Sequence, residues 1–169
     1  MFDDKTALGR VPVPFQSPAE RADYSALLEA SLSTPFVGQR KPWHIILIQD
    51  PATLEELGRS IPELICDSEE GPEWAVIICG DRRIKKRLGP LIADCYDATD
   101  SLLYAAHARS LNPQLSNLYP VSTDTERLRT LLQVPQHIMP FAIVSFGQRA
   151  GNAKRCLPDE TRIHRESWA

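Results

Sequence analysis

Short runs of consecutive apolar residues mark the predicted strands of this chain. Three of them, Trp43–Ile48, Trp74–Cys79 and Met139–Phe146, contain β-branched residues and little polar alternation. Such runs are typical of strands that are buried on both faces. A shorter strand is predicted near Leu115–Leu118. The pattern therefore predicts a sheet that helices cover on both sides.

Apolar residues at helical spacing fill the segments between these strands. The first helix is predicted to begin at Ser17, because Pro18 fits the first helical position and Glu20 completes a capping box with Ser17. Its predicted core-facing residues are Tyr24, Leu27, Leu28, Ser31 and Leu32. Further helices are predicted for residues 50–60, 91–109 and 123–132. The predicted buried stripe of the longest comprises Ile92, Cys95, Tyr96, Thr99, Leu102, Leu103 and Ala106.

The alternation of strands and helices predicts an α/β fold in three layers, with a central sheet between two layers of helices. One domain is expected to span residues 1–169. Within it, residues 1–16 and 148–169 have the character of arms. Arms on a small domain often reach across a partner subunit.

The composition is that of an ordinary globular protein. Of 169 residues, 43% are hydrophobic and 24% charged, which excludes wholesale disorder and allows a full core. The formal net charge of -3 gives no reason to expect nucleic acid or an anionic membrane surface as a partner. No apolar run reaches the roughly 18 residues of a membrane span, and the first residues lack the order of a signal peptide. We therefore predict a cytoplasmic protein without a membrane partner.

The usual signatures of catalytic side chains and metal ligands are missing. The sequence has no glycine-rich phosphate loop, no nucleophile elbow and no His-Glu-x-x-His motif, and its cysteines are not closely paired. Two charged groups leave alternatives open. Asp94, Asp97 and Asp100 form a carboxylate stripe that is either a solvated or salt-bridged face or a metal site. The basic cluster at residues 82–87 either is a solvated surface segment or recognises a phosphate, such as that of a nicotinamide nucleotide.

Four segments, in order, resemble the nitroreductase family of FMN-dependent oxidoreductases. Residues 35–43 read PFVGQRKPW, where family members usually show Pro-Ser-x-x-Asn-x-Gln-Pro-Trp before a strand. Residues 94–108 read DCYDATDSLLYAAHA and are similar to the family's central helix at the dimer interface. The third segment runs over residues 131–147, and the fourth is RIHRESW at residues 162–168. The resemblance covers nearly the whole chain.

The resemblance implies a nitroreductase-like fold with a mainly antiparallel or mixed sheet, and a homodimer with exchanged terminal arms. It further implies that FMN at the dimer interface takes hydride from NADH or NADPH and passes electrons, by a ping-pong route, to an unidentified small-molecule acceptor. Since the cofactor performs the chemistry, no catalytic side chain and no metal are expected. The implied cofactor-binding residues are Arg10, Phe36, Gln39, Lys41, Pro113, Gln114, Leu115, Lys154 and Arg155.

The sequence departs from the family pattern where the cofactor is held. The family's Arg-Arg-Ser-x-Arg-x-Phe corresponds to GRVPVPF at residues 9–15, which keeps Arg10 and Phe15 but lacks the serine and two arginines. Each lost donor weakens the grip on a phosphate by about 1.5–3 kcal/mol. Phe36 replaces the family's serine and is expected either to stack on the flavin ring or to block its pocket. The alternative function is therefore that of a nitroreductase-fold protein that has lost FMN and acts as a binding or assembly subunit.

Overall fold

The computed structural model describes residues 18–36, 38–61, 72–121 and 123–147. In chain order its elements are α1 Pro18–Leu32, β1 Trp43–Ile48, α2 Pro51–Ser60, β2 Trp74–Asp81, α3 Leu88–Ala108, β3 Pro113–Asn117, α4 Thr123–Leu131 and β4 Ile138–Phe146. Each predicted helix and strand is present, and the ends differ by a few residues. The predicted arms, residues 1–16 and 148–169, lie outside the described residues.

The four described strands form one antiparallel sheet in the order β1-β2-β4-β3. The central strands β2 and β4 are buried along almost their whole length, whereas β1 and β3 form the edges. At one end of the sheet Trp43 lies opposite Gly80, and at the other end Pro113 lies opposite Phe146. Because the strands pair antiparallel, the fold is of the α+β kind. Of the two predicted sheet types, mainly antiparallel and mixed, the structure has the antiparallel one.

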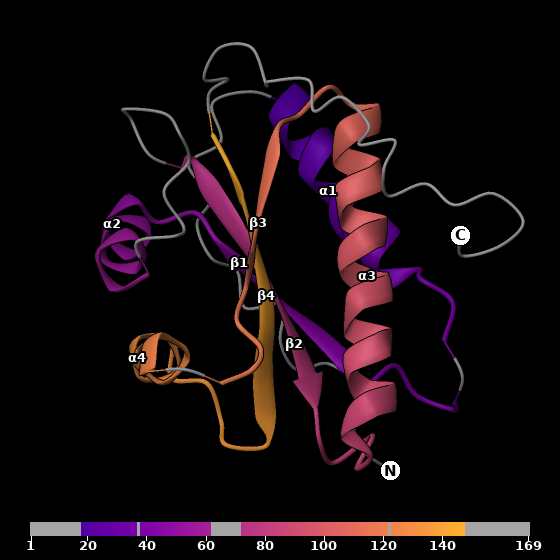
Figure 1. The fold of residues 1–169 in the computed structure, drawn as a ribbon. Helices are drawn as coiled ribbons and strands as arrows, with labels where there is room; N and C mark the ends of the chain where they lie inside the picture. Colours follow the sequence, from indigo (N-terminus) through magenta and orange to yellow (C-terminus); the bar gives the residue numbers. More distant parts are fainter. Residues whose placement is uncertain (1–17, 37, 62–71, 122, 148–169) are drawn as a thin grey trace, which may run out of the picture.

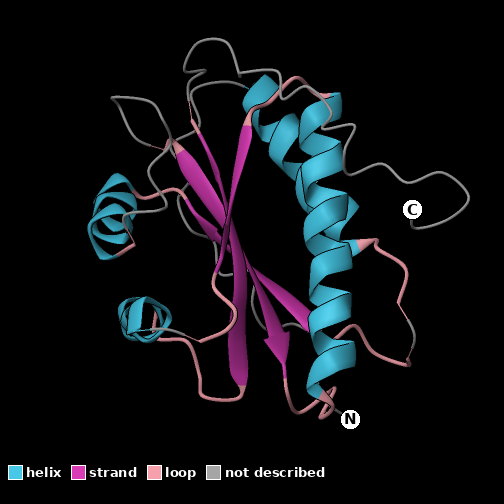
Figure 2. Cartoon of the chain, viewed as in Figure 1, coloured by secondary structure: helices cyan, strands magenta, loops and turns pink. Residues whose placement is uncertain are grey.

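Helices cover both faces of this sheet, as predicted. Figures 1 and 2 show α1 and α3 on one face and α2 and α4 on the other. Alternate residues of β2 supply the two cores. Val76 and Ile78 belong to the core beside α1 and α3, and Ala75 and Ile77 to the core beside α2 and α4. The strand is apolar throughout because both of its faces are covered.

Local sequence explains where the helices begin. The carboxylate of Asp50 accepts a hydrogen bond from the backbone N–H of Thr53 at 2.9 Å and so caps α2, with Pro51 in the first turn. α3 begins at Leu88, three residues before the predicted start. Pro90 is tolerated there because backbone N–H groups of the first turn have no partner within the helix.

Two residues predicted to face the core are partly exposed. Leu32 is 43% exposed, and Tyr96 is 39% exposed although its ring packs against the buried ring of Phe141, with centroids 4.3 Å apart. The buried face of α3 also includes Ala98, whose small side chain lets α1 approach closely. There the hydroxyl of Ser31 donates to the carbonyl oxygen of Ala98 at 2.8 Å. No helix in the described part of the chain is long and apolar enough to cross a membrane.

Candidate functional site

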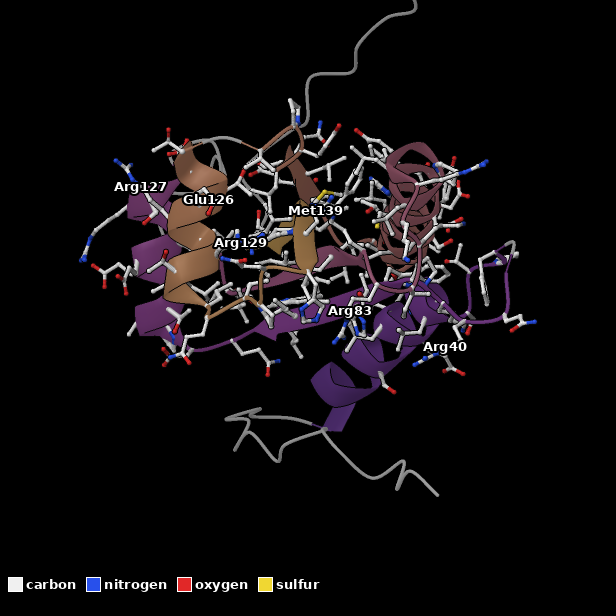
Figure 3. The ribbon with its side chains drawn as sticks, turned by 90° about the horizontal axis from the view of Figure 1, so that it is seen from below. Arg40, Arg83, Glu126, Arg127, Arg129 and Met139 are labelled. Carbon is white, nitrogen blue, oxygen red and sulfur yellow. The ribbon has the colours of Figure 1, made fainter. Side chains whose placement is uncertain are left out.

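A cleft of about 710 Å³ lies between the loop before β1 and the turn after β2. The residues that line it are Gly38, Gln39, Arg40, Pro42, Asp81, Arg83, Ile84 and Lys85. The two segments meet because the backbone N–H of Asp81 donates to the carbonyl oxygen of Pro42 at 2.6 Å, next to the first β1–β2 pair. Figure 3 shows Arg40 and Arg83 on the same side of the molecule, away from Arg127 on α4. Strand register therefore brings together two segments that are distant in the sequence.

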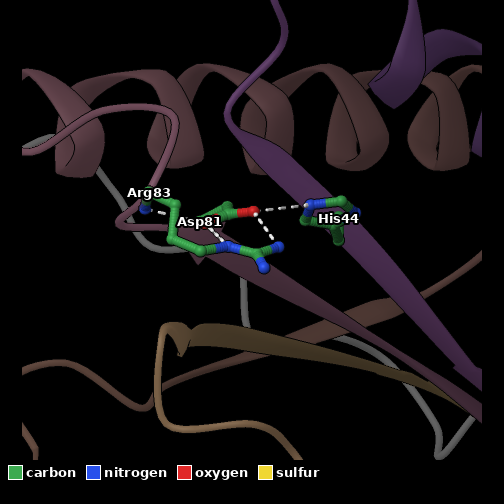
Figure 4. A network of polar contacts seen from close by, with 3 residues as sticks. All are labelled: His44, Asp81 and Arg83. Atoms are coloured by element: carbon green, nitrogen blue, oxygen red, sulfur yellow. Dashed lines mark hydrogen bonds and ion pairs between the residues drawn. The ribbon is translucent and has the colours of Figure 1, made fainter. Parts of the chain in front are cut away.

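Asp81 is a buried carboxylate on the wall of this cleft, with an exposed fraction of 1%. The backbone N–H of Arg83 donates to its Oδ1 at 2.8 Å, and the Nε and Nη2 of Arg83 donate to its two oxygens at 3.3 and 3.1 Å. The Nε2 of His44 lies 3.6 Å from Oδ2 (Figure 4).

These contacts keep Asp81 ionised. Burial by itself raises the pKa of Asp81, but the hydrogen bonds and the charge of Arg83, with a smaller contribution from His137, hold the pKa below its ordinary value of 3.8. The carboxylate is therefore charged at neutral pH. It fixes the guanidinium of Arg83 at the edge of the cleft.

Positive side chains outnumber carboxylates around the cleft. The cations are Arg40, Arg82, Arg83, Lys85, Lys86 and Arg87, of which three line the cleft and three follow in the turn before α3. A neighbouring hollow of about 500 Å³ is lined by Arg82, Arg83, Lys86, Gln136 and His137, so Arg83 borders both spaces. Two described carboxylates pair with these cations, namely Asp81 with Arg83 and Asp94 with Lys85.

The ion pair between Lys85 and Asp94 also explains the carboxylate stripe of α3. Asp94 is 8% exposed, whereas Asp97 and Asp100 are exposed to solvent. For Asp94 the salt-bridged interpretation is confirmed. The described residues contain no group of three or more histidine, cysteine, aspartate or glutamate side chains that could hold a metal ion.

Predicted cofactor-binding residues lie at two opposite ends of the sheet. Gln39 lines the cleft and Lys41 follows it before β1, whereas Pro113, Gln114 and Leu115 form the start of β3. Arg10, Lys154 and Arg155 lie outside the described residues.

The distance between the two groups can be estimated from the strand pairing. The start of β1 lies beside Gly80, and the start of β3 connects through Phe146 to Trp74. Gly80 and Trp74 are six residues apart on one strand, which is about 20 Å. One chain therefore does not bring the two groups to the same place.

Phe36 and Lys41 make contacts within the chain. The rings of Phe36 and Trp43 meet edge to face, with centroids 5.6 Å apart, and Phe36 is not among the residues that line the cleft. The ammonium of Lys41 donates to the carbonyl oxygen of Leu32, the last residue of α1. This contact satisfies a carbonyl at the end of the helix.

Relatives of this chain are found among known proteins, although no family model matches it. A protein of Methanothermobacter thermautotrophicus, provisionally named NADH dehydrogenase/NAD(P)H nitroreductase, is 31% identical over 145 residues. These cover 84% of this chain and 74% of that protein. The chain belongs to the nitroreductase-like family of oxidoreductases. A protein of Archaeoglobus fulgidus with the same provisional name is 28% identical over 155 residues, 86% of each chain.

Solved structures of the family have the same fold. The crystal structure of a protein of Parabacteroides distasonis, again provisionally named NADH dehydrogenase/NAD(P)H nitroreductase, gives a TM-score of 0.71 at 25% identity over 91% of this chain and 90% of that one. An FMN-dependent nitroreductase of Clostridium difficile gives 0.70 at 18% identity over 88% of both chains. The nitroreductase-like fold predicted from the sequence is confirmed.

Sequence reasoning did not single out Arg40 or Asp81. A signal for Asp81 exists, because an acid that directly follows an apolar buried strand is rarely left without a partner. Which segment lies across the cleft from Asp81 depends on the register of β1 and β2, however. A continuous apolar run specifies this register only weakly. The basic cluster at residues 82–87 could be identified in the sequence, but its position beside Arg40 could not be predicted.

Proposed function

We propose that this chain is an FMN-dependent NAD(P)H oxidoreductase that works as a homodimer in the cytoplasm. The relatives are named for NADH or NAD(P)H, and one structural neighbour is described as FMN-dependent. In the proposed reaction NADH or NADPH and a small-molecule acceptor use the same site in turn, by a ping-pong route.

The separation of the predicted FMN contacts is the observation that supports a dimer. Helix α3 has 21 residues and is about 30 Å long, and it runs from the turn after β2 to the segment before β3. Its outward face carries Tyr104, which is 76% exposed. If two copies pair through this face, antiparallel about a two-fold axis, the cleft end of one copy lies beside the β3 end of the other. Each cofactor site would then take residues 39–41 from one chain and residues 113–115 from its partner.

The described residues are compatible with the edge of a flavin ring. The amide of Gln39 offers both donors and an acceptor. Lys41 would exchange its contact with the carbonyl of Leu32 for a ring oxygen, and its charge would favour the reduced ring. Phe36 packs against Trp43, so the cleft is not filled by its ring.

Bound FMN would supply the hydride transfer, while the protein holds the ring, orients the donor and excludes water. In this proposal no side chain around the cleft acts as an acid, a base or a nucleophile.

The visible absorption spectrum of the purified protein tests the proposal. We expect a flavin band that remains after addition of excess FMN and desalting, and that bleaches when NADH or NADPH is added without oxygen. A protein that retains no FMN would refute the proposal. That result would favour the alternative of a binding or assembly subunit. This alternative is motivated by residues 9–15, which lack several of the family's phosphate donors.

A further inference from the structure

The residues around the cleft carry a net positive charge, although the chain as a whole is negatively charged. The whole sequence has a formal net charge of -3. Six cations and two carboxylates around the cleft leave a local charge of about +4, and no described acid pairs with Arg40, Arg82, Lys86 or Arg87. Like charges held close together repel one another, so this arrangement favours a bound anion.

The same charges are unfavourable for the helix that follows them. Lys85, Lys86 and Arg87 directly precede α3, whose first turn contains no acidic residue. Arg87 occupies the N-cap position and provides no side-chain cap. The positive end of a helix dipole repels cations and attracts anions. The stability of α3 alone would therefore select the opposite charges.

Arg83 is already oriented for such an anion. A guanidinium has five N–H donors, and two of those of Arg83 bind the carboxylate of Asp81. The side chain remains 67% exposed, so its other donors are accessible. A fixed guanidinium fork suits the oxygens of a phosphate, because less entropy is lost on binding.

The carboxylate of the cleft indicates which part of a dinucleotide fits. Free 2′-hydroxyls of a ribose are commonly bound by a carboxylate, whereas a 2′-phosphate is accommodated by arginine. Asp81 lines the cleft but is buried and already accepts from Arg83. The groups that remain for a ligand are cations, and a phosphate monoester brings a charge of about -1.5 to -2 with three acceptor oxygens.

We propose that Arg40 and Arg83 bind the 2′-phosphate of the electron donor, so that the protein uses NADPH in preference to NADH. This inference rests on the proposed function and names its donor. Gln39, a predicted contact of the flavin edge, lines the same cleft. A dinucleotide that approaches the ring from this side would therefore pass the cations.

Titration calorimetry with 2′,5′-ADP, 5′-AMP and inorganic phosphate tests the site without relying on turnover. We expect 2′,5′-ADP to bind at least about tenfold more tightly than 5′-AMP. The substitution Arg40→Gln should weaken 2′,5′-ADP about tenfold and leave 5′-AMP almost unchanged. The matched control is Arg59→Gln, an exposed arginine on α2 whose loss should change either affinity less than about twofold.

Equal affinities for the two nucleotides would overturn the inference, as would an Arg40→Gln protein that binds 2′,5′-ADP like the wild type. Inorganic phosphate that binds as tightly as 2′,5′-ADP would overturn the assignment to a nucleotide. Failure of this inference can be distinguished from failure of the proposed function. A colourless protein that binds 2′,5′-ADP through Arg40 refutes only the oxidoreductase proposal. A flavoprotein that NADH and NADPH reduce with equal KM refutes only the 2′-phosphate site.

Discussion

Replacement of Gly80 by alanine tests how closely β2 and α3 approach each other next to the cleft. A Cβ atom at this position would lie 3.0 Å from Cγ and Cδ1 of Leu91 and 3.1 Å from Sγ of Cys95. Carbon atoms in ordinary contact are about 3.5–4.0 Å apart, so the neighbours would have to move by about 0.5 Å. Both neighbours are fully buried. The strain therefore reaches the backbone of α3.

The expected loss of stability follows from two opposing contributions. An extra methyl group in a packed core typically costs about 1–3 kcal/mol. Removal of a glycine from a strand recovers about 0.5–1 kcal/mol of chain entropy. We expect Gly80→Ala to lower the free energy of unfolding by about 1–2 kcal/mol, and the Tm by about 2–8 °C for a chain of this size.

Urea denaturation at one fixed protein concentration, followed by tryptophan fluorescence, measures this difference. The control is Gly58→Ala in α2, where a Cβ atom meets nothing within 4 Å. There the same substitution should raise the free energy of unfolding by about 0.5–1 kcal/mol, because only the entropy of the unfolded chain changes.

A double variant identifies the contact itself. Leu91→Ala alone should cost about 2–5 kcal/mol, since it leaves a cavity at a fully buried position. Combined with Gly80→Ala, the new methyl group occupies part of that cavity, and the joint loss should fall about 1 kcal/mol below the sum. A Gly80→Ala protein as stable as the wild type, or strictly additive losses, would refute the close packing of strand and helix.

Other consequences concern charge, thiols and assembly. Asp81→Asn should lower the free energy of unfolding at neutral pH by about 1–3 kcal/mol, an amount reduced by solvent around the exposed Arg83. Because the folded pKa of Asp81 is lowered, its contribution is complete above the ordinary value of 3.8 and is lost as the pH falls through the folded pKa. Urea titrations from neutral to acidic pH should therefore show a flatter decline in the variant, and an identical decline would contradict the ion pair. Burial raises the pKa of Cys79 and Cys95 to about 12, so iodoacetamide at about pH 8 should alkylate neither until denaturant is added, as peptide mass mapping can check. Tyr104→Asp should convert the proposed dimer to a monomer in size-exclusion chromatography and release FMN, and a dimer that keeps FMN would exclude pairing through α3.

The elements of this fold could be predicted because residues close in sequence determine them. The run Trp74–Cys79 is apolar enough for burial on both faces, and Asp50 with Pro51 is a complete helix start. The order of strands is a different kind of information. It places β4 between β2 and β3, and nothing in a continuous apolar run distinguishes one neighbouring strand from another.

The burial of single residues in α3 also depends on contacts between segments. The sequence left a solvated or salt-bridged face and a metal site open for Asp94, and in the structure Asp94 is buried because Lys85, in the preceding turn, provides a partner. Tyr96, predicted to face the core, packs against Phe141 and is still 39% exposed. Helical periodicity assigns faces by hydrophobicity alone, so it cannot anticipate a buried charge that a partner from another segment makes acceptable.

The end of β2 unites these observations in one piece of structure. Gly80 lets α3 approach, Asp81 fixes the guanidinium of Arg83, and Lys85 holds the first turns of α3 through Asp94. A segment selected only for stability would place acids before the helix and leave no carboxylate buried at the end of an apolar strand. The chain does the reverse, and it does so within a cleft that also contains a predicted flavin contact. Local rules broken together in one place are expected at functional sites. We therefore regard the cations around the cleft as part of the ligand-binding site, and their packed support as the means by which the fold tolerates them.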